Sequence, residues 1–272
     1  MIDPMTTPRW FTHMILRTFR LRFLFARFTR LPLMGAFFKR TLFGGDAIVY
    51  LPQNRAVEVS RTISPGSQMF IPSEVIERFV DRSSHIVLMN WCICRKASGC
   101  KDYPQEFGCL FLGEASKHID PELGRPVTKE EAIAHLKKCR EAGLVHMIGH
   151  NRVDSIWLNA RPHRKLLTVC NCCPCCCLWK ILPGLSPVIS TDVTKMPGLE
   201  MTVDIDKCTG CGACTKSCFV NAITVDGGKA RISPDCRGCG RCAVKCPRSA
   251  IEVKMGDIEG TVERIASAVD VS

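Results

Sequence analysis

A duplicated pattern of cysteines constrains this chain more than any other feature of its sequence. The pattern C-x2-C-x2-C-x3-C occurs twice, beginning at Cys208 and again at Cys236. An Ala-Ile pair at 222–223 returns at 250–251 with the same offset, and a short β-like segment follows each pair. The C-terminal part is therefore an internally repeated module built around thiols. The first copy comprises Cys208, Cys211, Cys214 and Cys218, and the second comprises Cys236, Cys239, Cys242 and Cys246.

The spacing also predicts how these thiols divide between two metal centres. In each copy, three closely spaced cysteines share a tight loop, while the fourth begins a helical turn that points away and reaches the other centre. Glycines between the cysteines allow positive φ angles and turn backbone N–H groups toward the sulfurs. One [4Fe-4S] cluster is therefore expected on Cys208, Cys211, Cys214 and Cys246, and a second on Cys236, Cys239, Cys242 and Cys218.

The stretches CTGCGACTKSCF and CRGCGRCAVKCP resemble those of bacterial-type two-cluster ferredoxins over residues 201 to about 256. The resemblance implies one-electron transfer between a redox donor protein and an acceptor docked at opposite ends. That family has proline after the fourth cysteine of both runs, whereas here Pro247 follows the second run and Phe219 the first. We expect a local packing change beside Cys218 and no lost ligand. Two zinc knuckles are the alternative, which duplicated spacing without histidine disfavours.

The number of cysteines, 19 in 272 residues, allows either disulfides or metal ligation. Disulfide scaffolds are typically small secreted domains, but the segment 1–30 carries arginines throughout and lacks a cleavage-site pattern. No run of 18 apolar residues is free of charge, so no bilayer-spanning helix is expected. The sequence predicts a protein of a reducing, anaerobic cytoplasm, with any membrane contact peripheral and at the inner face.

Eleven further cysteines precede the duplicated module and form two main groups. An apolar strand predicted at 86–89 leads into the group that starts at Cys92, and another at 166–169 leads into the group that starts at Cys170. A helix over 129–142 lies between the strands in sequence, which suggests a βαβ unit. Parallel strands end at the same edge of a sheet, so the two groups should meet in space.

We expect these two groups to build a third metal site, most simply another iron-sulfur cluster. The region resembles the N-terminal half of uncharacterised ferredoxin-like proteins of anaerobes through CICR, GCLFLG, EAGLVH and CNCCPCCC, a resemblance that brings no assigned chemistry. Structural zinc and free buried cysteines with a redox-active pair are the alternatives. Arg95 would stabilise a thiolate, bind an anionic partner or lie exposed in its loop. The candidate ligands are Cys92, Cys94, Cys100, Cys109, Cys172, Cys173 and Cys176.

Positions 1–45 form a basic arm, with eight Lys or Arg residues against Asp3, and so carry +7 of the formal net charge of +11. At 100° per residue the arginines gather on one helical face and aromatic and aliphatic residues on the other, apart from Arg22 in the apolar face. Such a helix suits an acidic membrane surface, or packs on this protein or a partner subunit. Nucleic acid is not expected, because no reading motif accompanies the charge. The face comprises Arg9, Arg17, Arg20 and Arg27.

Elsewhere the pattern predicts strands at 47–51 and 57–59, a turn at 64–67 and a helix over 73–80. A helix with apolar spacing over 257–271 should pack on the ferredoxin domain. His146 and His150 are expected to be ordinary core or surface histidines.

Taken together, the sequence predicts an α+β iron-sulfur protein that transfers electrons. Its parts are a basic amphipathic arm (1–45), a cysteine-rich α/β domain (46–198), a two-cluster ferredoxin domain with a pseudo-twofold βαβ-type repeat (199–256) and a C-terminal helix (257–272). Two alternatives stay open. One is a reductase or redox-complex subunit whose catalytic centre is the N-terminal cysteine cluster, and the other is a zinc-stabilised docking module that carries a ferredoxin.

Overall fold

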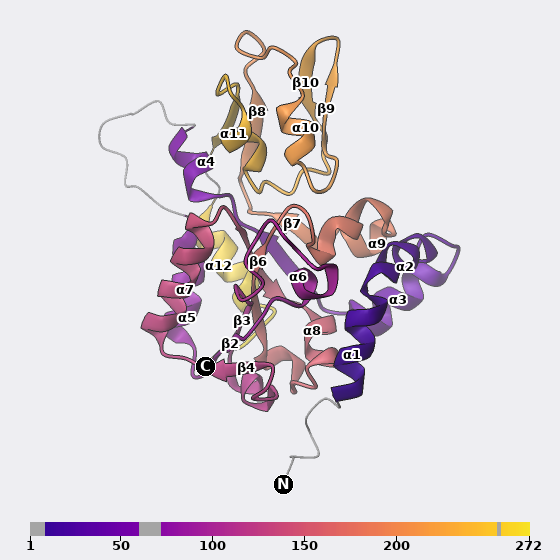
Figure 1. Cartoon of the computed structure of the whole chain (residues 1–272), viewed down its shortest axis with the longest axis vertical. Helices are drawn as coiled ribbons and strands as arrows, with labels where there is room; N and C mark the ends of the chain where they lie inside the picture. The colour runs from indigo at the N-terminus through magenta and orange to yellow at the C-terminus, as the bar shows by residue number, and fades with distance from the viewer. Residues whose placement is uncertain (1–8, 60–71, 255–256) are drawn as a thin grey trace.

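The computed structural model describes residues 9–59, 72–254 and 257–272 and shows a mixed α/β fold, compatible with the predicted α+β class. A large sheet with helices on both faces forms the body of the molecule, and a smaller unit with strands β8–β11 projects from one end (Figure 1). The arm helices α1, α2 and α3 lie along one side of the body (Figure 1). The predicted turn at 64–67 falls outside the described residues.

The large sheet has seven strands in the order β4-β2-β3-β6-β5-β1-β7. All adjacent pairs are antiparallel except β1 and β7, which run parallel. The strands are apolar because both faces of the sheet are covered by helices. They are β1 (Ala47–Tyr50), β2 (Ile86–Met89), β3 (Leu110–Leu112), β4 (Gly124–Pro126), β5 (Val145–His150), β6 (Leu167–Cys172) and β7 (Val193–Lys195).

The described residues do not form the expected βαβ unit, but β2 and β6 still end at the same edge of the sheet. Helix α7 (Lys129–Glu141), with the capping box of Thr128 and Glu131, connects β4 to β5 rather than β2 to β6. Strand β3 lies between β2 and β6 and is antiparallel to both, so β2 and β6 run in the same direction. Their carboxyl ends therefore reach the same edge of the sheet, and β1 and β7 end there as well.

The two faces of the sheet are packed by different helices. On one face, Val49 and Ile148 join α5 (Ser73–Arg82), α7 and α12 (Ile258–Ala266) in the main core. The alternate residues Ile48 and Tyr50 face a second cluster that includes η4 (Leu178–Gly184) and Phe219. This alternation follows from the two-residue period of a strand.

Two predictions of local structure were wrong. Residues 57–59 belong to helix α4 (Asn54–Val59) and not to a strand, and Ala56 on this helix is fully buried. The C-terminal helix α12 packs on α5 and β1 of the large sheet, where Ile265 is fully buried, rather than mainly on the ferredoxin-like unit. Apolar periodicity shows that a helix has a buried face but does not say which neighbour covers it.

The smaller unit consists of two strand–helix–strand copies in sequence. Strand β8 pairs with β11 and β9 pairs with β10, all antiparallel, and the β8–β11 pair joins the first strand of one copy to the last strand of the other. Positive φ angles recur at equivalent positions of the two copies, at Gly212 and Gly240 and at Asn221 and Ser249. The elements are β8 (Glu200–Val203), α10 (Ala213–Ser217), β9 (Ile223–Asp226), β10 (Lys229–Ile232), α11 (Arg241–Lys245) and β11 (Ile251–Lys254).

The basic arm is several short helices rather than one. Phe11 and Ile15 pack inward on the body. The ring centroids of Phe25 on α2 and Phe38 on α3 are 4.7 Å apart. No helix among the described residues has both the length and the apolar character needed to cross a bilayer. The helices are α1 (Arg9–Thr18), η1 (Phe19–Leu21), α2 (Arg22–Phe28) and α3 (Met34–Leu42).

We predict that His146 limits the acid stability of this fold. Its Nδ1 lies 2.8 Å from Asn171 Oδ1 on β6, and burial lowers the pKa of His146 to about 3. In the unfolded chain the His146 imidazole is protonated near pH 6.5, whereas in the folded chain it stays neutral to a much lower pH. The free energy of unfolding therefore falls as the pH decreases below 6.5. His146→Gln should reduce the loss of unfolding free energy between pH 7 and pH 5 by about 2 kcal/mol. Anaerobic chemical denaturation at both pH values measures this.

Replacement of the exposed His13 by Gln is the control and should leave that pH dependence unchanged. An unchanged pH dependence in His146→Gln would contradict the prediction.

Candidate metal centres

Four cysteines from both copies of the repeat surround a small cavity in the ferredoxin-like unit. The cavity has a volume of about 20 Å³ and is also lined by Gly210 and Gly212. The backbone N–H of Ala230 donates to Cys208 Sγ at 3.3 Å, and that of Ala250 donates to Cys246 Sγ at 3.3 Å. These thiols can hold a cluster whose sulfurs accept backbone hydrogen bonds. The four are Cys208, Cys211, Cys214 and Cys246.

A second cavity of about 20 Å³ is related to the first by the repeat. The backbone N–H of Ala222 donates to Cys218 Sγ at 3.2 Å, and that of Gly238 donates to Cys236 Sγ at 3.4 Å. The structure thus brings together both cysteine quartets expected from the spacing, with the fourth cysteine of each run lining the cavity of the other. The lining cysteines are Cys218, Cys236, Cys239 and Cys242.

The two cavities differ in their exposure to solvent. Cys211 in the first is exposed, and the N–H groups of Ala230 and Gly210 lower the pKa of Cys208. Cys239 in the second lies against the body, where its carbonyl accepts the N–H of Gln53, and burial raises the pKa of Cys239 to about 11. The first cavity therefore faces the outside and the second faces the large sheet.

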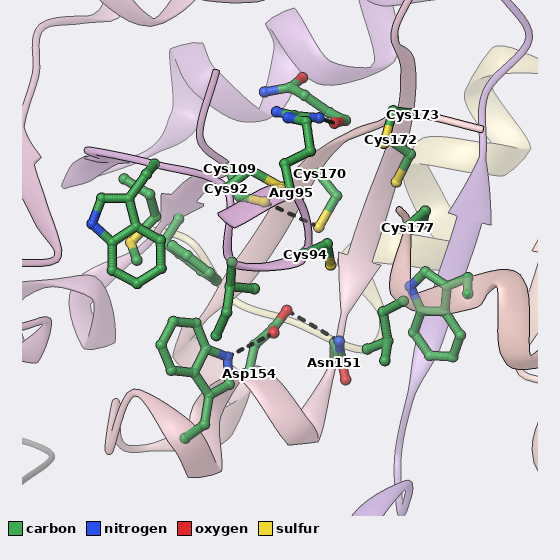
Figure 2. Close-up of a pocket in the computed structure, with 18 residues that line it drawn as sticks. Cys92, Cys94, Arg95, Cys109, Asn151, Asp154, Cys170, Cys172, Cys173 and Cys177 are labelled. Atoms are coloured by element: carbon green, nitrogen blue, oxygen red, sulfur yellow. Dashed lines mark hydrogen bonds between the residues drawn. The ribbon is translucent and has the colours of Figure 1, made fainter. Parts of the chain in front are cut away.

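A third cavity, of about 60 Å³, lies at the edge of the sheet where β2 and β6 end. Figure 2 shows the Cys92, Cys94, Cys109 and Cys170 side chains gathered in it, with Cys172 and Cys177 beside them. The Sγ atoms of Cys109 and Cys170 are 3.4 Å apart. This cavity is called the six-cysteine pocket below, after Cys92, Cys94, Cys109, Cys170, Cys172 and Cys177.

The sulfurs of the pocket lie close enough to change one another's pKa. Hydrogen bonds from Cys109 and Cys94 lower the pKa of Cys92, and those from Cys170 and Cys177 lower the pKa of Cys172. Hydrogen bonds to neighbouring sulfurs and burial raise the pKa of the other four thiols. Sulfur ligands suit a metal cluster rather than hard cations.

The seven N-terminal candidate ligands separate into two groups. Cys92, Cys94, Cys109 and Cys172 line the pocket, whereas Cys100, Cys173 and Cys176 form a compact set with Cys175, although Cys173 also borders the pocket. Cys170, Cys175 and Cys177 were not among the ligands predicted from the sequence. The only sign in the sequence that these residues are ligands is that they belong to a stretch with six cysteines in eight residues, whose side chains cannot all point in one direction.

Arg95 lies between the pocket and this compact set and is fully buried, not exposed in a loop. Its Nη1 donates to the Asn171 carbonyl at 2.8 Å, and Nη2 donates to the Phe107 carbonyl. Burial alone would lower the pKa of Arg95, but the charges of Cys92, Cys109 and Cys173 raise it above its ordinary value. The guanidinium therefore stays charged and offsets thiolate charge.

Arg22 also lies near the cysteines, and this position accounts for its departure from the basic face of the arm. Its guanidinium stacks on the Phe19 ring at 4.0 Å and donates from Nη1 to the Phe19 carbonyl at 2.9 Å. Burial lowers the pKa of Arg22, while the charges of Cys94, Cys177 and Cys176 oppose that shift. The arm thus contributes a positive charge toward the cysteines.

A carboxyl group completes the pocket. Asp154 on α8 (Arg152–Trp157) accepts hydrogen bonds from Trp157 Nε1 at 3.0 Å and Asn151 Nδ2 at 3.1 Å (Figure 2). Thr168 Oγ1 also donates to it, at 2.9 Å. Burial raises the pKa of Asp154 to about 6 despite these donors. Asp154 is therefore a carboxyl with a raised pKa beside the sulfurs, and it is not among the residues predicted from the sequence.

Two aromatic rings connect the pocket with the second ferredoxin cavity. Phe219 follows Cys218, and its ring centroid is 5.1 Å from that of Tyr50 on β1. Tyr50 Oη lies 3.6 Å from Cys177 Sγ and 3.9 Å from Cys172 Sγ. The phenylalanine in place of the usual proline thus packs between the two cysteine sites.

Comparison with known families supports the C-terminal site. Residues 201–224 match the family described as 4Fe-4S binding domain. The chain therefore contains a ferredoxin-type iron-sulfur domain, carries at least one [4Fe-4S] cluster and is an iron-sulfur protein of the electron-transfer kind. Comparisons with curated proteins and with solved structures found no match.

We predict that Arg95 is a main stabilising residue of the cysteine-rich body. Arg95→Met would leave two buried carbonyls without donors and thiolates without a neutralising charge, which should lower the free energy of unfolding by about 3 kcal/mol. Anaerobic denaturant titration measures this. The neighbouring Lys96, whose Nζ lies 4.0 Å from the centroid of the Trp91 ring, is the control, and Lys96→Met should cost less than about 1 kcal/mol. Equal losses in the two variants would contradict the role of Arg95.

Proposed function

We propose that this protein relays electrons through two [4Fe-4S] clusters to a third iron-sulfur centre in the six-cysteine pocket. The observation that carries the proposal is the pair of small cavities, each lined by four cysteines drawn from both copies of the repeat. The family match covers the first run only, so the second cluster rests on the repeated geometry. The proposed ligands are Cys208, Cys211, Cys214 and Cys246 for one cluster and Cys236, Cys239, Cys242 and Cys218 for the other.

The exposure of the two sites supports a direction for the relay. A donor protein can approach the cluster beside the exposed Cys211, while the cluster beside Cys239 faces the body. From there, the Phe219 and Tyr50 rings lead to Cys172 and Cys177 of the pocket. Closely packed groups shorten the gap that an electron must cross, so this contact is the proposed route to the third centre.

Two features of the pocket support a cluster there. Six sulfurs converge on one cavity, and the buried Nε of Arg95 has no hydrogen-bond partner within the described residues. Hydrogen-bond donors directed at sulfur tune the potential of an iron-sulfur centre. The pocket therefore offers sulfur ligands, and the guanidinium of Arg95 in its lining carries an N–H group that is unpaired among the described residues.

Iron and acid-labile sulfide analysis of the full-length protein tests this proposal. Three cubes predict about twelve iron atoms per chain in anaerobically purified protein. The double variant Cys94→Ser/Cys170→Ser should retain about eight, because the ferredoxin ligands are intact. Cys139→Ser is the control, since Cys139 is buried on α7 outside the pocket lining, and it should keep the full iron content. A double variant with undiminished iron and sulfide would exclude a cluster in the pocket.

A reductase is the second candidate function, favoured by Asp154 beside the sulfurs. Reduction of a bound substrate needs protons as well as electrons, and a carboxyl with a raised pKa can supply them. A catalytic centre would also keep one coordination position for substrate. Cyanide added to the reduced protein should then change the EPR spectrum of the pocket centre and leave the ferredoxin signals unchanged. An unaltered spectrum would favour the relay.

We also propose that the arm binds an anionic membrane surface at the cytoplasmic face. Its exposed side chains combine large apolar groups with arginines, and Leu33, 88% exposed, holds a left-handed conformation at the turn between α2 and α3. A bulky apolar residue held in this way at a tip is unusual and suits insertion between lipids. The Arg9 side chain lies outside the described residues. The exposed residues include Trp10, Leu21, Phe23, Leu24, Phe28, Leu31 and Phe37, with Arg17, Arg20, Arg27 and Arg40 among them.

Vesicle sedimentation tests this membrane contact. The protein should bind vesicles of phosphatidylglycerol and phosphatidylcholine more tightly than phosphatidylcholine alone, and high salt should weaken binding. Leu21→Ser/Leu24→Ser/Phe28→Ser should weaken it by about tenfold or more, because apolar burial is lost. Ile205→Ser removes an exposed apolar residue of the ferredoxin-like unit, away from the arm, and should have no effect. Equal binding by both variants would assign the arm to a partner subunit.

A further inference from the structure

The compact set beside the pocket consists of four sulfurs, hereafter the quartet: Cys100, Cys173, Cys175 and Cys176. All four Sγ atoms lie within 4.8 Å of one another, and those of Cys100 and Cys175 are 3.5 Å apart. In a tetrahedron with metal–sulfur bonds of about 2.3 Å, the sulfurs lie about 3.8 Å apart. The quartet therefore has the dimensions of a shell around a single ion.

The ferredoxin-like unit supplies an internal comparison. All eight of its cysteines lie among the described residues, yet no three of them meet the spacing that the quartet meets. They surround cavities instead, as expected where a cluster of several atoms must fit between the thiols. Among the described residues, the cysteines of the ferredoxin-like unit are spaced around cavities, whereas those of the quartet are close together. The quartet therefore suits a different kind of centre.

The backbone around the quartet is arranged for thiolates. Cys173 and Cys176 form a C-x2-C pair, and the N–H of Cys176 donates to Cys173 Sγ at 3.3 Å. At Cys100, burial would raise the pKa of the thiol, but N–H groups of Tyr103 and Asp102 and nearby thiols lower it overall. Metal-binding loops stabilise sulfur ligands in this way. At Cys175 and Cys176 burial raises the pKa of the thiol, so there a bound metal ion would have to displace the proton.

Nearby cations offset the negative charge of such a site. Four thiolates and one divalent ion carry a net charge of about −2. The buried Arg95 interacts with Cys173, and Lys180 Nζ donates to the Cys175 carbonyl at 3.2 Å. An all-sulfur, tetrahedral and closed set of ligands is typical of structural zinc.

We propose that the quartet binds one zinc ion, separate from any cluster in the six-cysteine pocket. The ion joins the loop that contains Cys100 to the segment that follows β6 and begins at Cys173, far along the chain. Cys172 and Cys177, which flank Cys173 and Cys176 in sequence, line the pocket. The zinc ion would therefore fix the position of the segment that carries the pocket sulfurs of Cys172 and Cys177. This inference does not depend on the proposed relay.

Metal analysis of the full-length, anaerobically purified protein tests the zinc site. The wild type should contain about one zinc ion per chain beside its iron. Cys100→Ser/Cys175→Ser should lose the zinc and retain the roughly eight iron atoms and the sulfide expected for the two clusters of the ferredoxin-like unit. The matched control, Cys94→Ser/Cys170→Ser in the pocket, should keep the zinc. Wild type without zinc, or a quartet variant that keeps zinc or loses iron and sulfide in place of it, would overturn the proposal.

Zinc-edge X-ray absorption on the wild-type protein provides a measurement that does not depend on the folding of a variant. The proposal predicts four sulfur neighbours at about 2.3 Å and no iron neighbour. Nitrogen or oxygen ligands, or an iron neighbour, would exclude a mononuclear site of four thiolates.

Discussion

The direction in which the strands of the large sheet run determines where the N-terminal cysteine groups meet and where the ferredoxin-like unit is attached. Strands β1, β2, β6 and β7 end at one edge, because two antiparallel pairings place β3 between β2 and β6 and one parallel pairing joins β1 to β7. The chain leaves β2 and β6 into the two cysteine groups and leaves β7 into the ferredoxin-like unit. Reversal of β2 or β6 would separate sulfurs that now share the six-cysteine pocket.

Cysteines packed this closely can ionise to bind metal only if the negative charge of the thiolates is offset. Arg95 is buried between the quartet and the pocket, Arg22 approaches from the arm, and Arg241 donates to the Cys172 carbonyl from the ferredoxin-like unit. These three arginines come from three different parts of the chain. The arm, the body and the smaller unit are thus joined at the cysteine centres by charge as well as by apolar packing.

The sequence allowed the local features to be predicted, and it failed where distant segments decide the outcome. The two sets of four cysteines in the ferredoxin-like unit follow from spacing alone, since their loops are short and duplicated. The capping box at Thr128 likewise marks the start of α7. In contrast, the division of thiols between pocket and quartet depends on which way each side chain points after β6, and nothing in CNCCPCCC records that. The roles of Tyr50 and Asp154 depend on pairing of β1 and on packing of α8, which no short motif encodes.

The return of the chain to the large sheet also has a consequence for kinetics. Because β7 precedes the ferredoxin-like unit and α12 packs on β1 and α5 after it, that unit is anchored at both of its ends. Carriers on a single flexible tether deliver electrons at a rate limited by diffusion of the tethered domain. Under the proposed relay, the folded core sets the separation between the donor and acceptor centres, so solvent viscosity should have little influence on the internal electron step.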